Sequence, residues 1–176
     1  MRAALLSVLC FACFFCVSIE VCAQSSSELT ALFKSKNYDR SLELAKKMLV
    51  GNQNNLLALE VAAKSCASLD DNHGAVFYME RYVALKPVPF QLYFLALYLS
   101  RCKEYEKSSE AINKCLARDP NFGPAYLFRA DLVKRTEGVS AKYKSDVSLA
   151  SKCKFEDSGF QKDLALARKI AGFPPI

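Results

Sequence analysis

The sequence is poor in the residues and motifs on which most enzymes depend. It has one histidine, His73, and it lacks a Gly-x-Ser-x-Gly elbow, a glycine-rich phosphate loop and a His–Glu metal pattern. His73 stands beside Gly74 at a break between two apolar segments, which predicts a solvent-facing turn. The acidic residues Asp70 and Asp71 precede a helix start, where the helix dipole favours negative charge. The sequence therefore predicts no catalytic residue, no bound metal and no cofactor.

Pairs of cysteines with C-x-x-C spacing are absent after residue 23. The spacing does occur in the segment 10–16, but its apolar flanks place those cysteines in an N-terminal targeting segment and not in a metal site. Four cysteines follow, and four cysteines can pair in three ways. They are Cys66, Cys102, Cys115 and Cys153.

Residues 1–23 have the pattern of a secretory signal peptide. Arg2 precedes the apolar run 3–19, and the small residue Ala23 offers a cleavage site. An uncleaved anchor is the alternative, because the run approaches the ~20 residues that span a bilayer. We expect an exported protein, in the periplasm or cell envelope of a bacterium or otherwise secreted. It would contact a membrane only through this segment, if the segment is not cleaved.

Charge is spread along the chain and no long block of one sign is present. The chain has 24 Lys and Arg against 18 Asp and Glu, a net charge of +6, and lysines alternate with acids as in the stretch KEYEK over 103–107. Interspersed charge is typical of a solvated surface. Together with export, it predicts protein or peptide partners and no nucleic acid.

From Ser25 onward the chain repeats itself. Apolar residues recur at helical spacing in paired segments that are separated by short polar breaks. Three sets of equivalent positions are separated by the same 34, 33 and 38 residues. The sets are Tyr38, Asn72, Tyr105 and Tyr143; Met48, Tyr82, Cys115 and Cys153; and Gln53, Pro87, Pro120 and Ser158. A fixed period of this length is the signature of a helical repeat protein.

These markers resemble the tetratricopeptide repeat, a pair of antiparallel helices of about 34 residues. The family places small residues where its helices cross, and Ala63, Ala96, Ala130, Ala75 and Ser108 match those positions. The outer repeats depart from the pattern at the positions of Leu29, Ser41 and Asp146. The resemblance implies an all-α, right-handed solenoid of antiparallel helix pairs over 24–158. It has about four repeats, 25–54, 55–88, 89–122 and 123–158, and a C-terminal capping helix and tail over 159–176.

The apolar periodicity also predicts the individual helices. After a first helix that begins near Ser25, they cover 41–50, 56–69, 75–85, 90–102, 107–118, 123–135, 144–154 and 159–172. In the last of these, Leu164, Leu166, Ala167 and Ile170 form a broad apolar face, which predicts a helix that covers the end of the solenoid.

The predicted helix over 90–102 is apolar nearly all round, which indicates burial on most faces or a bound partner. In the family the first helices of the repeats line a concave surface, and the register implies which side chains face it. These are Leu57, Glu60, Lys64, Phe90, Tyr93, Leu97, Arg101, Leu127, Asp131 and Lys134. The interpretation is a non-catalytic scaffold or adaptor that binds a peptide or partner segment there.

Other interpretations of the same features stay open. The C-terminal helix could fold back onto this strip, or the helix over 90–102 could simply be buried. The strip could also mediate self-association in a homo-oligomer, and the cysteines could give an accessory subunit a thiol-dependent role. Equivalent residues of successive repeats lie about 8–10 Å apart, beyond the ~4.4–6.8 Å that a disulfide needs between Cα atoms. We therefore expect Cys66, Cys115 and Cys153 to be buried thiols, with a bridge as the alternative, and Cys102 to be the exposed and reactive one.

Overall fold

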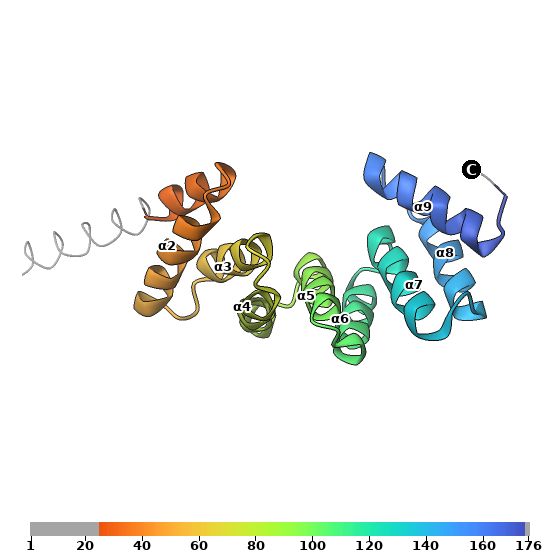
Figure 1. The fold of residues 1–176 in the computed structure, drawn as a ribbon, viewed down its shortest axis with the longest axis horizontal. Helices are drawn as coiled ribbons and strands as arrows, with labels where there is room; N and C mark the ends of the chain where they lie inside the picture. Colours follow the sequence, from red (N-terminus) through yellow and green to blue (C-terminus); the bar gives the residue numbers. More distant parts are fainter. Residues whose placement is uncertain (1–24, 175–176) are drawn as a thin grey trace, which may run out of the picture. The chain divides into compact units, whose positions relative to one another are not determined.

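The computed structural model describes residues 25–174, and this part of the chain is helical with no strands (Figure 1). The predicted signal peptide lies outside the described residues. Helical residues 25–34 come first. They are followed by α2 (Tyr38–Gly51), α3 (Leu56–Ser68), α4 (Asn72–Leu85), α5 (Pro89–Arg101), α6 (Tyr105–Arg118), α7 (Gly123–Glu137), α8 (Ala141–Lys152) and α9 (Ser158–Ala171). Among the described helices, none is both long and apolar enough to cross a membrane.

Each predicted helix is present, with its ends within about three residues of the predicted ones. The predicted position of His73 in a turn between helices is wrong. The helix predicted to begin at Ala75 begins at Asn72, so the exposed side chain of His73 lies in the first turn of α4 and not in a turn between helices. The helix starts earlier because Asp71 accepts a hydrogen bond from the backbone N–H of Gly74 at 2.8 Å and thereby caps it.

The turns between the helices of a pair carry a further periodic marker. Lys36, Asp70 and Lys103 have positive φ angles of 60°, 63° and 63°. Each lies two residues before Tyr38, Asn72 or Tyr105, so the left-handed residue recurs with the helices. In the last pair the extra residues are accommodated differently, because Gly138, with φ 73°, ends α7 five residues before Tyr143. The local conformation therefore repeats even where the residue type does not.

Within the repeats α5 packs with α6 and α7 with α8, and α2 of the first repeat packs against α3 of the second. The positions at which the sequence predicts close crossing are all buried. They are Leu29, Ala63, Ala96 and Ala130 on the first helices and Ser41, Ala75, Ser108 and Asp146 on the second helices. The polar members have partners, since Ser41 Oγ lies 2.8 Å from Ser65 Oγ and Ser108 Oγ donates to the Ala96 carbonyl at 2.7 Å. The chain divides within α4, between Tyr78 and Met79, into two compact units.

In the second unit, α9 packs against α7 and α8 (Figure 1). It buries Phe160, Leu164 and Ala171 in a cluster with Ala130, Tyr143, Val147 and Ala150. The Tyr143 hydroxyl donates to the Ala167 carbonyl of α9 at 3.2 Å. The helix therefore caps α7 and α8 as expected. Leu166, however, is not part of the contact, since its side chain is 59% exposed.

Candidate functional site

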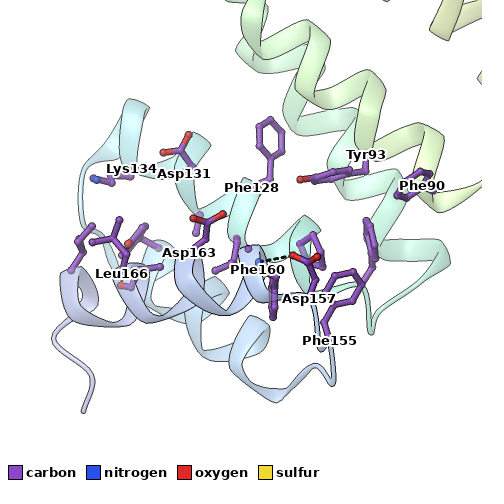
Figure 2. Close-up of a pocket in the computed structure, with 18 residues that line it drawn as sticks. Phe90, Tyr93, Phe128, Asp131, Lys134, Phe155, Asp157, Phe160, Asp163 and Leu166 are labelled. Atoms are coloured by element: carbon purple, nitrogen blue, oxygen red, sulfur yellow. Dashed lines mark hydrogen bonds between the residues drawn. The ribbon is translucent and has the colours of Figure 1, made fainter. Parts of the chain in front are cut away.

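A cavity of about 530 Å³ lies among α5, α7 and α9 in the second unit, and Figure 2 shows it. Its volume is within the range of about 300–1,000 Å³ that is usual for ligand pockets. Most of its lining is aromatic or aliphatic. The aromatic members are Phe90 and Tyr93 of α5, Phe122 before α7, Phe128 of α7, Tyr143 of α8, Phe155 before α9 and Phe160 of α9. We refer to the cavity with this lining as the aromatic groove.

The rings of the groove contact one another in series. Tyr93 lies edge-to-face against Phe122 and Phe128, with ring centroids 5.4 Å and 5.9 Å apart. Phe122 in turn lies 6.0 Å from Phe155, and Phe155 lies 5.3 Å from Phe160. These distances are those of favourable aromatic pairs. The series joins the α5 side of the groove to the α9 side, so the two walls support each other.

Gly123 allows the α9 wall to approach α7. A Cβ atom at this position would lie 2.7 Å from Cζ of Phe160 and 3.1 Å from Cβ of Cys153. Real Cβ atoms do not approach other heavy atoms so closely, so a side chain at Gly123 would displace Phe160. The glycine at the start of α7 is therefore required by close packing and not by an unusual backbone angle.

Two large apolar side chains lie at the edges of the groove in contact with solvent. Phe90 of α5 is 49% exposed and Leu166 of α9 is 59% exposed. In Figure 2 they lie on opposite sides of the view. Exposed apolar side chains beside a cavity are a common feature of surfaces that bind partners.

Four charged residues line the groove. Asp131 pairs with Arg135 at 2.7 Å, and Asp157 caps α9 by accepting the backbone N–H of Phe160 at 2.9 Å. Lys134 and Asp163 are exposed, and within residues 25–174 Asp163 forms neither an ion pair nor a hydrogen bond. Burial raises the pKa of the Tyr93 phenol, and the negative charge of Asp163 raises it further.

The structure brings half of the predicted binding residues together. Phe90, Tyr93, Leu127, Asp131 and Lys134 all line the groove. Leu97 and Arg101 lie further along α5 and do not line it. The remaining three, Leu57, Glu60 and Lys64, belong to α3 in the first unit, where Lys64 Nζ contacts Glu60 Oε1 at 2.6 Å.

The sequence interpretation missed the wall formed by α9 and by the links before α7 and α9. One of its alternatives, in which the C-terminal helix folds back onto the strip, describes part of what is observed. The missed residues include Phe122, Phe155, Phe160 and Asp163. A signal was present, because Phe122 and Phe160 end near-identical stretches, Asp-Pro-Asn-Phe over 119–122 and Asp-Ser-Gly-Phe over 157–160. That repetition indicated register but not which face the two rings occupy.

Among residues that do not line the groove, an ion pair and a hydrogen bond of Arg129 join three helices. The Arg129 guanidinium of α7 donates to both carboxylate oxygens of Asp146 in α8, from Nε at 2.9 Å and from Nη2 at 2.6 Å. Its Nη1 donates to Asn113 Oδ1 of α6 at 2.8 Å. The bond to Asp146 raises the pKa of Arg129. Asp146 occupies the position at which the other repeats have Ser or Ala. A buried carboxylate requires a partner of opposite charge, but the repeat pattern does not show which residue that partner is.

None of the four cysteines of the described residues forms a disulfide, so none of the three pairing arrangements occurs. Cys66 and Cys115 are buried as expected. Cys153, which was expected to be buried, and Cys102, which was expected to be exposed, are both half-buried. Burial raises the pKa of both Cys66 and Cys115 to about 11. Very little reactive thiolate is therefore present on either side chain at neutral pH.

We expect a maleimide to modify Cys102 first in the native protein and Cys153 next. Cys66 and Cys115 should react at least about tenfold more slowly than Cys102, because a buried thiol reacts mainly from an opened state. Timed labelling followed by peptide mass spectrometry measures the order, with labelling in denaturant as the control for intrinsic reactivity. Equal native rates for Cys66 and Cys102 would contradict the expected order.

The fold is that of tetratricopeptide-repeat proteins, although no protein-family model and no curated protein matches the sequence. A crystal structure of MamA superposes with a TM-score of 0.70 at 16% identity, covering 81% of this chain and 83% of that chain. YrrB, described as a TPR protein with an unusual peptide-binding site, gives 0.67 at 10% identity, with 82% and 75% covered. TTC0263, a thermophilic TPR protein of Thermus thermophilus, gives 0.65 at 16% identity, with 83% and 80% covered. At these identities the likeness concerns the all-α repeat fold alone.

Proposed function

We propose that this chain is a non-catalytic protein-interaction module that binds an extended or helical segment of a partner in the aromatic groove. One observation carries the proposal. A cavity lined by aromatic rings that contact one another opens between Phe90 and Leu166, two apolar side chains that are exposed to solvent.

The chemistry of the groove suits binding better than catalysis. Its lining within the described residues contains no histidine, cysteine, serine or threonine, and its groups that could carry a proton are the side chains of Asp, Lys and Tyr. Apolar rings supply affinity when a partner removes them from water, at roughly 25 cal/mol per Å² of apolar surface. Asp131 and Lys134 at the rim provide polar groups that can orient a bound segment.

Self-association is a second candidate function, because the exposed side chains of Phe90 and Leu166 could equally be covered by another copy of the chain. A thiol-dependent accessory role has less support, since two of the four thiols are buried. We also propose export to a bacterial periplasm or cell envelope, or secretion. This rests on the pattern of residues 1–23, and sequencing the N-terminus of the purified protein would test it by showing whether Gln24 comes first.

The double variant Phe90→Glu/Leu166→Glu should weaken peptide binding at least about tenfold, because each substitution places a charge where an apolar contact is expected. The probe is a labelled peptide selected on the wild-type protein from a random library, and fluorescence anisotropy measures its affinity. Both residues are exposed, so we expect the helical circular dichroism to be unchanged.

Val139→Glu is the matched control, since Val139 is 45% exposed in the same unit but lies between α7 and α8, away from the groove. Equal affinity of the wild type and the double variant would refute binding in the groove. Light scattering on the three proteins addresses self-association. A dimer that dissociates only in the double variant would assign the groove to a second copy of this chain.

A further inference from the structure

The sign of the charge at the aromatic groove is opposite to that of the chain. The chain carries a net charge of +6. The groove lining, in contrast, contains three carboxylates, Asp131, Asp157 and Asp163, and a single ammonium group, that of Lys134. A local excess of one sign beside an apolar cavity attracts ligands of the other sign.

The three carboxylates are not equally available. Asp131 pairs with Arg135, and Asp157 is engaged in capping α9. Asp163 has no ion pair within the described residues and projects from the middle of α9. In Figure 2 its carboxylate lies between α9 and the side of the groove that carries Asp131 and Phe128. Its charge contributes to the raised pKa of the Tyr93 phenol of α5, and both side chains line the groove.

We propose that the aromatic groove selects partner segments in which a lysine or arginine stands beside an apolar anchor residue, with Asp163 as the main carboxylate that receives the cation. This specificity rests on the proposed binding function and adds the charge of the ligand to it. The apolar anchor would contact Phe90, Leu166 and the rings between them, and the cation would lie over Tyr93 or Phe128 within reach of Asp163.

Aromatic rings next to a carboxylate suit a cation for two reasons. The negative ring face attracts an ammonium or guanidinium group, and the carboxylate accepts its hydrogen bonds. The same unit already places guanidinium groups over rings, with Arg129 5.4 Å from the centroid of Tyr126 and Arg168 5.7 Å from that of Phe173. An acidic ligand would meet net repulsion, because Arg135 is engaged with Asp131 and only Lys134 opposes the carboxylates.

The experiment uses three synthetic peptides with blocked ends, identical apolar residues and Lys, Gln or Glu at one central position. We expect the Lys peptide to bind about tenfold more tightly than the Gln peptide, and the Glu peptide to bind most weakly. Raising the salt concentration to about 1 M should reduce the preference, because it shortens the screening length to about 3 Å. Titration calorimetry on the full-length chain measures all three affinities.

Variants then test whether Asp163 causes the preference for the Lys peptide. Asp163→Asn should reduce the Lys-over-Gln ratio to about two and Asp163→Lys should reverse the order of Lys and Glu. Glu156→Gln is the matched control, since it removes an exposed carboxylate near the start of α9 that does not line the groove, and it should leave the ratio unchanged. Asp163 is exposed, so these variants are expected to fold.

The outcomes distinguish a failure of the proposed cation specificity from a failure of the proposed binding function on which it rests. Equal binding of the three peptides, reduced by Phe90→Glu/Leu166→Glu, would refute the selection of cations and leave binding in the groove intact. A preference for the Glu peptide would refute the selection as well. If no peptide, including one selected from the random library, binds the wild type, both proposals fail. A Lys preference that Asp163→Asn reduces to about twofold and that Glu156→Gln leaves unchanged would establish the assignment.

Discussion

Replacing Arg129 with alanine should lower the free energy of unfolding by about 3 kcal/mol, because the buried carboxylate of Asp146 would lose its cation. The side chain of Asp146 is only 7% exposed, and that of Arg129 is 27% exposed. Asp146 accepts two bonds from Arg129, and water cannot readily replace both at a position enclosed by α7 and α8. Chemical denaturation followed by circular dichroism measures the change.

Replacing the other partner of the ion pair, Asp146, should lower the free energy of unfolding by less. Asp146→Ala installs the small residue found at the equivalent position of α4, Ala75, and leaves a guanidinium that is partly solvated and still bonded to Asn113. We expect the double variant Arg129→Ala/Asp146→Ala to be more stable than Arg129→Ala alone, since no buried charge is left without a partner. If the double variant has the same free energy of unfolding as Arg129→Ala, this account is wrong.

Arg135→Ala is the matched control for the loss of an arginine from the same helix. Its ion pair with Asp131 is exposed on both sides, so its removal should change stability by less than about 1 kcal/mol. A cost as large as that of Arg129→Ala would show that the loss of any arginine from α7, and not the loss of the buried pair, determines the effect.

Phe160→Ala should destabilise the second unit by about 3–4 kcal/mol, as is usual when a buried phenylalanine is truncated. The side chain is 6% exposed and packs with Leu164, Tyr143 and Val147 in the cluster that holds α9 on α7 and α8. It also contacts Phe155 within the series of groove rings. The substitution should therefore remove one wall of the groove, so that peptide binding is lost together with the protection of α9 from proteolysis.

Leu166→Ala provides the control on the same helix. Leu166 is exposed, so its truncation should change the free energy of unfolding by less than about 0.5 kcal/mol and leave α9 resistant to proteolysis. Thermal unfolding and timed trypsin digestion, with cleavage at Lys162 and Lys169 as the readout, compare the two variants. If Phe160→Ala digests at the wild-type rate, α9 is not held by this ring.

Much of the helical architecture could be predicted because it depends on near neighbours. Helix ends follow from residues such as Asn55, Ser140 and Asp157, whose side chains accept bonds from the first turns of α3, α8 and α9. The crossing positions follow from the repeat, since the close approach of two helices favours small residues, and Ala or Ser occupies six of the eight positions. Asp146 departs from that pattern, and its partner Arg129 lies 17 residues away.

The groove depended on contacts that no local pattern specifies. The register placed Phe90, Tyr93, Leu127, Asp131 and Lys134 on one surface, and the structure assembles them around one cavity. The opposite wall comes from Phe155, Phe160 and Asp163, which follow the last predicted repeat or lie at its end. The sequence placed Leu164 and Leu166 on one broad apolar face of α9, and only contact with α7 and α8 decided that Leu164 is buried while Leu166 is exposed.

By itself, the sequence determined the repeated helix pairs, because helix formation, turn conformation and crossing geometry all depend on residues within one period of about 34. It also determined the charge of the chain and the spacing of its small residues. Only the tertiary structure decided that α9 lies back along α7 and converts an exposed strip into an aromatic groove with an acidic rim. The physical reason is that the packing of α9 depends on residues distant in the sequence, since the absence of a side chain at Gly123 leaves room for the Phe160 ring at the start of α7.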